Sequence, residues 1–191
     1  MSFYLFFDFE TTGIGDIRNQ RAIQLAWIVS DCNFNILSQN SYYIKGNKEI
    51  NTNFHKNLTI EFIEKNGYEL EFVLTEFDKD ITSIFSNNGY FIAHNISFDS
   101  HILFNEIRAC DYVSSISEND FNDKSICTMK KTVNICKLPS KSGGWKYPKL
   151  IELYRFLYGH EPDGVLHEAS MDTNVLYNCY KRLTENGFWE N

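Results

Sequence analysis

The stretch Phe3-Tyr4-Leu5-Phe6-Phe7-Asp8-Phe9-Glu10 decides how this chain folds. Its first five residues are all apolar, which is typical of a strand buried on both faces in the middle of a sheet. Side chains two residues apart point to the same face of a strand, so Asp8 and Glu10 leave it together while Phe7 and Phe9 enter the core. Because charges inside a protein are costly, a carboxylate pair at the end of such a strand needs an explanation beyond packing.

Strands and helices follow one another along the rest of the chain. Two more strands are predicted at residues 21–30 and 34–44, joined by a hairpin turn at Asp31-Cys32-Asn33. Apolar spacing and turn residues then predict helices at 59–66, 70–86, 97–109, 148–158 and 168–186, a strand at 90–93, and loops at 111–123 and 139–148. Ser97 is the predicted N-cap of the third helix, and Gly187 is predicted to end the last one. This order predicts an α/β domain over residues 1–191, with a mixed β-sheet flanked by helices.

The composition fits a single globular domain, because 43% of the 191 residues are apolar and 16% are aromatic. The N-terminal apolar run is too short for a signal peptide, so no membrane segment is expected. The five cysteines form no Cys-x-x-Cys pair, which favours free thiols in a reducing, intracellular and cytoplasmic setting. A net charge of −7 argues against a protein that coats long nucleic acids by electrostatics alone.

Two further segments carry polar residues of the same kind. Asn95 and Asp99 fall at the start of the predicted helix after residues 90–93, where ligands often bind in α/β sheets. Alone, Asp99 would be explained by the helix dipole, and His94 by a structural role. His167 is predicted on a loop before the last helix and Asp172 in its first turns. A lone surface histidine would carry little weight, so the combination of segments is what indicates a site.

The three segments together supply four carboxylates, from Asp8, Glu10, Asp99 and Asp172. Four such groups repel one another, so a fold that gathers them needs a strongly positive partner between them. Side-chain oxygens suit Mg²⁺ and Mn²⁺ better than zinc or copper. The sequence therefore predicts a site for two divalent cations at the end of the first strand.

In their order and separations, three stretches of this sequence resemble the motifs of the DEDDh family of 3′-to-5′ exonucleases. They are Asp8-Phe9-Glu10-Thr11-Thr12-Gly13, Asn95-Ile96-Ser97-Phe98-Asp99 and His167-x-x-x-x-Asp172. The resemblance covers about residues 3–186 and implies a ribonuclease H-like fold. A tyrosine branch of the same superfamily would have Tyr four residues before the last Asp. Here that residue is Glu168, so the histidine branch fits better.

The resemblance implies that Asp8, Glu10, Asp99 and Asp172 ligate two Mg²⁺ or Mn²⁺ ions and that His167 is the general base. It also implies that single-stranded nucleic acid is shortened from its 3′ end to nucleoside 5′-monophosphates. The residues matching the family's substrate-binding side are Thr11, Thr12, Gly13, Ile14, Asn95 and Phe98. For Ile14 and Phe98, simple core packing is an equally good interpretation.

A basic strip at residues 124–149 holds seven lysines and no acidic residue, which leaves −14 on the rest of the chain. Trp145 and Lys146 lie in it beside Gly143-Gly144. Lysines next to aromatic side chains suit a single strand, with charges along its phosphates and rings stacked on its bases. A solvated basic loop is the other interpretation.

Other functions are compatible with the same residues. DNA is the favoured substrate, but an oligoribonuclease-like enzyme that clears short RNA has the same motifs. A non-catalytic nucleic-acid-binding module on this fold is disfavoured, because all five chemical residues are intact. A polymerase or replication partner is possible, although a free-standing enzyme is favoured.

Overall fold

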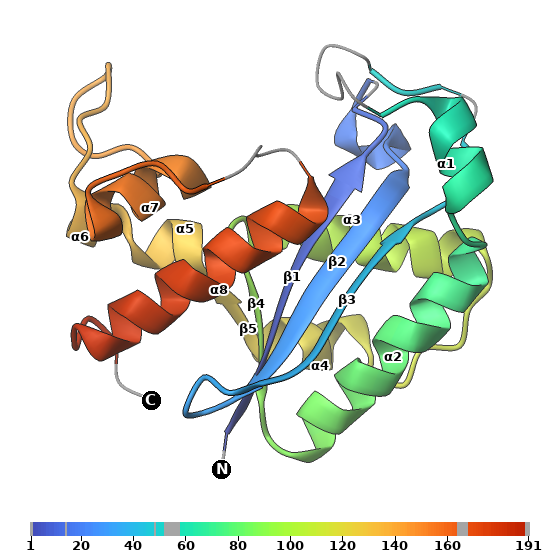
Figure 1. Cartoon of the computed structure of the whole chain (residues 1–191), viewed down its shortest axis with the longest axis horizontal. Helices are drawn as coiled ribbons and strands as arrows, with labels where there is room; N and C mark the ends of the chain where they lie inside the picture. Colours follow the sequence, from blue (N-terminus) through green and yellow to red (C-terminus); the bar gives the residue numbers. More distant parts are fainter. Residues whose placement is uncertain (1, 14, 48, 52–57, 164–167, 190–191) are drawn as a thin grey trace.

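The computed structural model describes residues 2–13, 15–47, 49–51, 58–163 and 168–189 (Figure 1). Its centre is a five-stranded mixed sheet in the order β3-β2-β1-β4-β5. β1 pairs antiparallel with β2 and parallel with β4, so it is the central strand that its apolar run predicts. The strands are β1 (Phe3–Thr11), β2 (Ala22–Asp31), β3 (Ile36–Tyr43), β4 (Tyr90–Ala93) and β5 (Ser125–Cys127).

Helices cover both faces of the sheet, with α8 across one face and α2 and α3 on the other side (Figure 1). The predicted α/β class with a mixed, helix-flanked sheet is confirmed. None of the described helices is long and apolar enough to cross a membrane. The helices are η1 (Ile17–Asn19), α1 (Ile60–Asn66), α2 (Leu70–Ser86), α3 (Ile96–Ala109), α4 (Glu118–Asp123), α5 (Thr128–Lys131), α6 (Val133–Cys136), α7 (Leu150–Tyr158) and α8 (Ala169–Glu185).

The alternation of β1 divides the core into two layers. Phe7 and Phe9 are buried on the side of α2 and α3, where the Phe7 ring lies 5.7 Å from that of Phe77. Tyr4 and Phe6 point to the other side and pack against α8. Asp8 and Glu10 belong to this second set, so they lie on the α8 face, as their spacing predicts.

Two predictions near the middle of the chain are wrong. α3 begins at Ile96 after Asn95, so Ser97 lies inside the first turn and is not its N-cap. The predicted loop at residues 111–123 contains α4, whose first turn is capped by Ser117. Phe121 of this helix is fully buried and stacks on Phe91, which stabilises an element too short to show periodicity.

The basic strip also contains elements that the sequence analysis missed. β5, α5 and α6 have three, four and four residues, and each is too short for a periodic apolar pattern. Residues 139–148 are a loop, as predicted, and Pro139 and Trp145 form an isolated bridge across it. Gly143 and Gly144 both have positive φ, a conformation in which glycine is favoured.

Candidate active site

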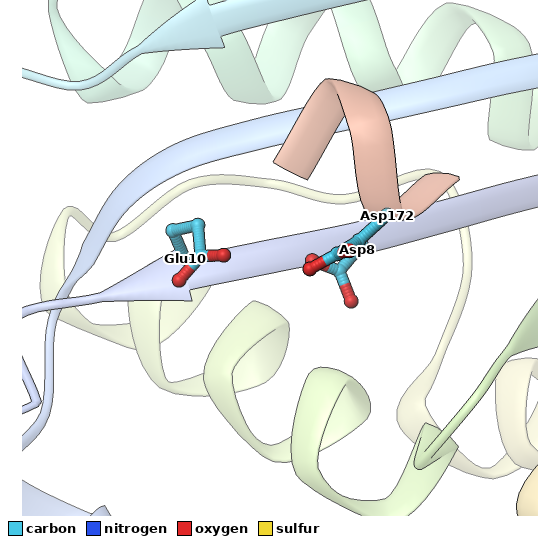
Figure 2. A group of neighbouring side chains, drawn as sticks. All are labelled: Asp8, Glu10 and Asp172. Atoms are coloured by element: carbon cyan, nitrogen blue, oxygen red, sulfur yellow. The ribbon is translucent and has the colours of Figure 1, made fainter. Parts of the chain in front are cut away.

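Three carboxylates meet on the α8 face of the sheet, near the end of β1. One oxygen each from Asp8, Glu10 and Asp172 lie within 4.8 Å of one another. Figure 2 shows Asp172 reaching from α8 towards Asp8 on β1, with Glu10 further along the same strand. All three side chains are half-buried. The structure therefore brings together residues separated by more than 160 positions, as the prediction requires.

Asp99 approaches the same strand from the first turn of α3 and is buried. Its Oδ1 accepts a hydrogen bond of 3.2 Å from the backbone N–H of Phe9, the residue between the two β1 acids. Asp99 is also the strongest charged influence on Asp8, whose pKa it raises. The fourth predicted ligand thus lies beside the group of three, held by β1 itself.

Electrostatics at this site are unfavourable for four ionised acids. Burial raises the pKa of Asp8 well above its usual range, and Asp99, Asp172 and Glu10 raise it further. Burial and the neighbouring carboxylates raise the pKa of Glu10 to about 8, and burial raises that of Asp99 to about 7. Among the described residues, no lysine or arginine is a cause of these shifts. The donor set therefore fits hard divalent cations, which would supply the missing positive charge.

The turn after β1 is held by side chains from elsewhere in the chain. The Thr11 hydroxyl donates to Gln20 Oε1 over 2.7 Å, and Thr12 Oγ1 accepts from the Arg21 N–H. Asn51 donates twice to this turn, from its backbone N–H to the Thr12 carbonyl and from Nδ2 to the Gly13 carbonyl. Both threonines are buried, so their side chains fix the turn, and their contact with substrate stays a prediction.

The other predicted substrate residues lie in different settings. Asn95 is exposed at the start of α3, near Asp99. Phe98 is half-buried and packs against the main core, in agreement with the packing interpretation. Ile14 and His167 lie outside the described residues, so their roles stay predictions.

Trp145 and Lys146 lie on the loop between α6 and α7, which projects from the body of the protein (Figure 1). The Trp145 side chain is exposed, and Lys146 Nζ is 2.5 Å from Glu152 Oε1. Lys130 of the same basic strip donates from Nζ to Ser97 Oγ in the first turn of α3, over 3.2 Å. One end of the strip therefore adjoins the helix that carries Asp99.

His94 has a structural role, as the sequence analysis favoured. Its Nδ1 lies 3.0 Å from Thr128 Oγ1, and its Nε2 lies 2.9 Å from the carbonyl oxygen of Pro148. Burial lowers the pKa of His94. The ring thus joins the end of β4 to α5 and to the far end of the projecting loop.

Sequence reasoning missed a buried glutamate that supports the same region. Glu106 of α3 accepts hydrogen bonds from the Arg21 guanidinium and, over 2.7 Å, from the Ala22 N–H. These contacts fix the start of β2 against the helix that carries Asp99. A lone acid on the apolar face of a predicted helix was the one signal that could have identified it.

Solved structures of exonuclease I have the same fold. E. coli exonuclease I in complex with a dT13 oligonucleotide matches 96% of this chain with a TM-score of 0.72 and 19% sequence identity. The E. coli enzyme in complex with a dA16 oligonucleotide matches 97% of this chain, with a TM-score of 0.72 and 16% identity. Apo exonuclease I matches 97%, with a TM-score of 0.72 and 18% identity.

This chain spans 41% of the length of the two oligonucleotide-bound chains and 42% of the apo chain. No protein-family model and no curated protein matches the sequence. At such identities the likeness concerns the fold, and it confirms the predicted ribonuclease H-like α/β architecture.

Proposed function

We propose that this chain is a metal-dependent 3′-to-5′ exonuclease of the DEDDh type that acts on single-stranded nucleic acid, with DNA as the favoured substrate. The observation that carries the proposal is the convergence of Asp8, Glu10 and Asp172, with Asp99 beside them. Gathering these acids destabilises the fold, and a purely structural role offers no interaction that offsets this cost. The fold shared with exonuclease I, seen in complexes with dT13 and dA16, supports the same conclusion.

Asp8, Glu10, Asp99 and Asp172 would hold two Mg²⁺ or Mn²⁺ ions. When bound, such ions activate a water and stabilise the charge on the leaving oxygen of a phosphodiester. The chain's own contribution is to fix the four acids on β1, α3 and α8. The Phe9 N–H orients Asp99 through Oδ1. A carboxylate has about four lone-pair sites on its two oxygens, so one such contact is compatible with binding a cation.

His167 would accept the proton of the attacking water, which a neutral imidazole does near neutral pH. The water oxygen bonds to phosphorus, the bond from phosphorus to the 3′-oxygen breaks, and the leaving oxygen takes a proton from solvent. The products are a nucleoside 5′-monophosphate and a strand shorter by one nucleotide. Thr11, Thr12, Gly13, Ile14, Asn95 and Phe98 would contact the terminal nucleotide.

The test is digestion of a 5′-labelled single-stranded DNA oligomer and its RNA twin, with Mn²⁺ and with EDTA. We expect a ladder that shortens from the 3′ end, released 5′-monophosphates, and no product in EDTA. A 3′-phosphate should block the reaction. Faster cleavage of the RNA twin would favour the oligoribonuclease-like alternative. Binding without cleavage of either strand would favour a non-catalytic module.

The basic strip provides a separate prediction. Trp145→Ala should raise the KM for a 20-nucleotide strand and leave that for a dinucleotide unchanged, because the projecting loop would contact only longer strands. Loss of one stacked base is worth roughly 1–3 kcal/mol, or about 5- to 150-fold in affinity. Phe156→Ala, which removes another exposed aromatic ring, is the matched control. An equal KM for both variants and the wild type, at low and moderate salt, would remove the strip from the substrate path.

A further inference from the structure

Gln24 is a fully buried polar side chain next to the acidic cluster. In the antiparallel pairing of β1 with β2, Gln24 stands opposite Glu10, and Ala26 stands opposite Asp8. Opposite residues share a face of the sheet, with Cβ atoms about 4.5–5.5 Å apart. Gln24 therefore lies on the face that α8 covers, directly opposite Glu10 and diagonal to Asp8.

The side-chain amide of Gln24 connects three elements. Its Nε2 donates to Ser41 Oγ on β3 over 3.1 Å, and its Oε1 accepts from the backbone N–H of Ala169 over 3.1 Å. Ala169 is the first residue of α8. A buried amide with a partner at each end holds the groups that it bonds in place, and an end that water cannot reach is costly to leave unpaired.

The first turn of α8 depends on this contact. The N-cap residue Glu168 makes no side-chain capping hydrogen bond, although the first N–H groups of a helix have no partner within it. Gln24 supplies an acceptor to one of them from the neighbouring strand. The cap that the helix lacks in its own sequence thus comes from the strand beside the site.

A second attachment lies one turn further along. Thr173 Oγ1 is 3.3 Å from the Ala26 carbonyl oxygen on β2, and 2.7 Å from the Ala169 carbonyl. Asp172 lies between the two attachment points, at Ala169 and Thr173. Because Asp172 is the only one of the three clustered acids that comes from α8, its distance to β1 depends on how this turn is held.

We propose that Gln24 is a positioning residue, which fixes the first turn of α8 on β2 so that Asp172 meets Asp8 and Glu10. The expected effect of Gln24 on turnover rests on the proposed function. Its expected effects on metal affinity and on the hydrogen-exchange protection of α8 do not. The ligand concerned is a divalent cation, and Mn²⁺ is the probe.

The test compares Gln24→Met with Ser41→Ala. The first removes the acceptor of the Ala169 N–H and keeps the side-chain volume, whereas the second breaks only the other end of the amide contact. Ser41 is exposed, so its hydroxyl position is open to water. Thr173→Val, which removes the second attachment, is tested in parallel and serves alone if Gln24→Met does not fold.

Three measurements are made on each variant: Mn²⁺ affinity by calorimetry, amide hydrogen exchange of Ala169, and kcat and KM on single-stranded DNA. For Gln24→Met we expect Mn²⁺ affinity to fall roughly 10- to 100-fold, as for other residues that orient metal ligands. Exchange at Ala169 should quicken roughly tenfold, the equivalent of one lost hydrogen bond. The kcat should fall while KM stays within about twofold, and Ser41→Ala should match the wild type.

The inference is overturned if Gln24→Met keeps wild-type Mn²⁺ affinity, even when its melting temperature drops, because the role is then merely structural. It is also overturned if Ser41→Ala loses as much affinity. If the wild type binds Mn²⁺ but cuts no nucleic acid, the proposed function fails, and the affinity and exchange data still decide the role of Gln24. If the wild type binds no Mn²⁺, the inference is overturned together with the metal site.

Discussion

Asp8→Asn is expected to abolish nuclease activity and, in the absence of metal, to make the protein more stable. The charges of Asp99, Asp172 and Glu10 all raise the pKa of Asp8, in addition to the effect of its burial. Removing its charge takes away a shared ligand, so the rate should fall by more than roughly 10³-fold, beyond the loss of a single electrostatic contact. Stability should move in the opposite direction, because the variant no longer buries that charge among three others.

The sign of the stability effect follows from the raised pKa of Asp8. A folded-state pKa above the unfolded value means that ionised Asp8 destabilises the fold, and that protonation removes the penalty as the pH falls. The melting temperature of Asp8→Asn should thus exceed that of the wild type most clearly at pH 8, by roughly 2–4 °C per kcal/mol relieved. The difference should shrink towards pH 5.

Bound metal should reverse this order of stability and make the wild type more stable than Asp8→Asn. Mn²⁺ at 100 times its Kd should stabilise the wild type by about 2.7 kcal/mol and leave Asp8→Asn nearly unchanged. The exposed Asp123→Asn is the matched control and should behave as the wild type in every respect. If Asp8→Asn is less stable than the wild type without metal, or if the wild type shows no shift with Mn²⁺, the acidic cluster is not a preformed cation site.

The part of this site that was predictable from sequence depends on local geometry. The apolar run before Asp8 identifies a central strand, and the two-residue spacing to Glu10 places both acids on one face. The long helices were also predictable from the sequence, because α2 buries apolar residues at three- and four-residue steps. Each of these inferences uses residues within a few positions of one another.

The rest depends on partners that are distant in sequence. Gln24 is a single polar residue in an apolar strand, and its function becomes visible only when Ala169, 145 positions away, is placed beside it. Glu106 is similar, since its partners lie at the start of β2. The elements β5, α4, α5 and α6 are too short for a periodic signal and are stabilised by packing, as at Phe121.

His167→Ala should lower kcat by roughly 10²–10⁴-fold, the usual contribution of a general base. His167 lies outside the described residues, so kinetics rather than geometry must test its role. The substitution leaves all four acids in place, so the increase in melting temperature with Mn²⁺ should persist. That combination, metal binding kept and turnover lost, separates the general base from the ligands, because Asp8→Asn is expected to lose both.

The pH profile provides the sharper test. A histidine base works only when neutral, so wild-type kcat should fall about tenfold per pH unit once the imidazole becomes protonated at acidic pH. In His167→Ala this limb should vanish, and added imidazole should restore part of the rate. His160→Ala, which removes an exposed histidine bonded to the Glu161 carbonyl, is the control and should keep the wild-type profile. If His167→Ala retains the acidic limb at an undiminished rate, another group accepts the proton of the water, and the assignment to the histidine branch fails.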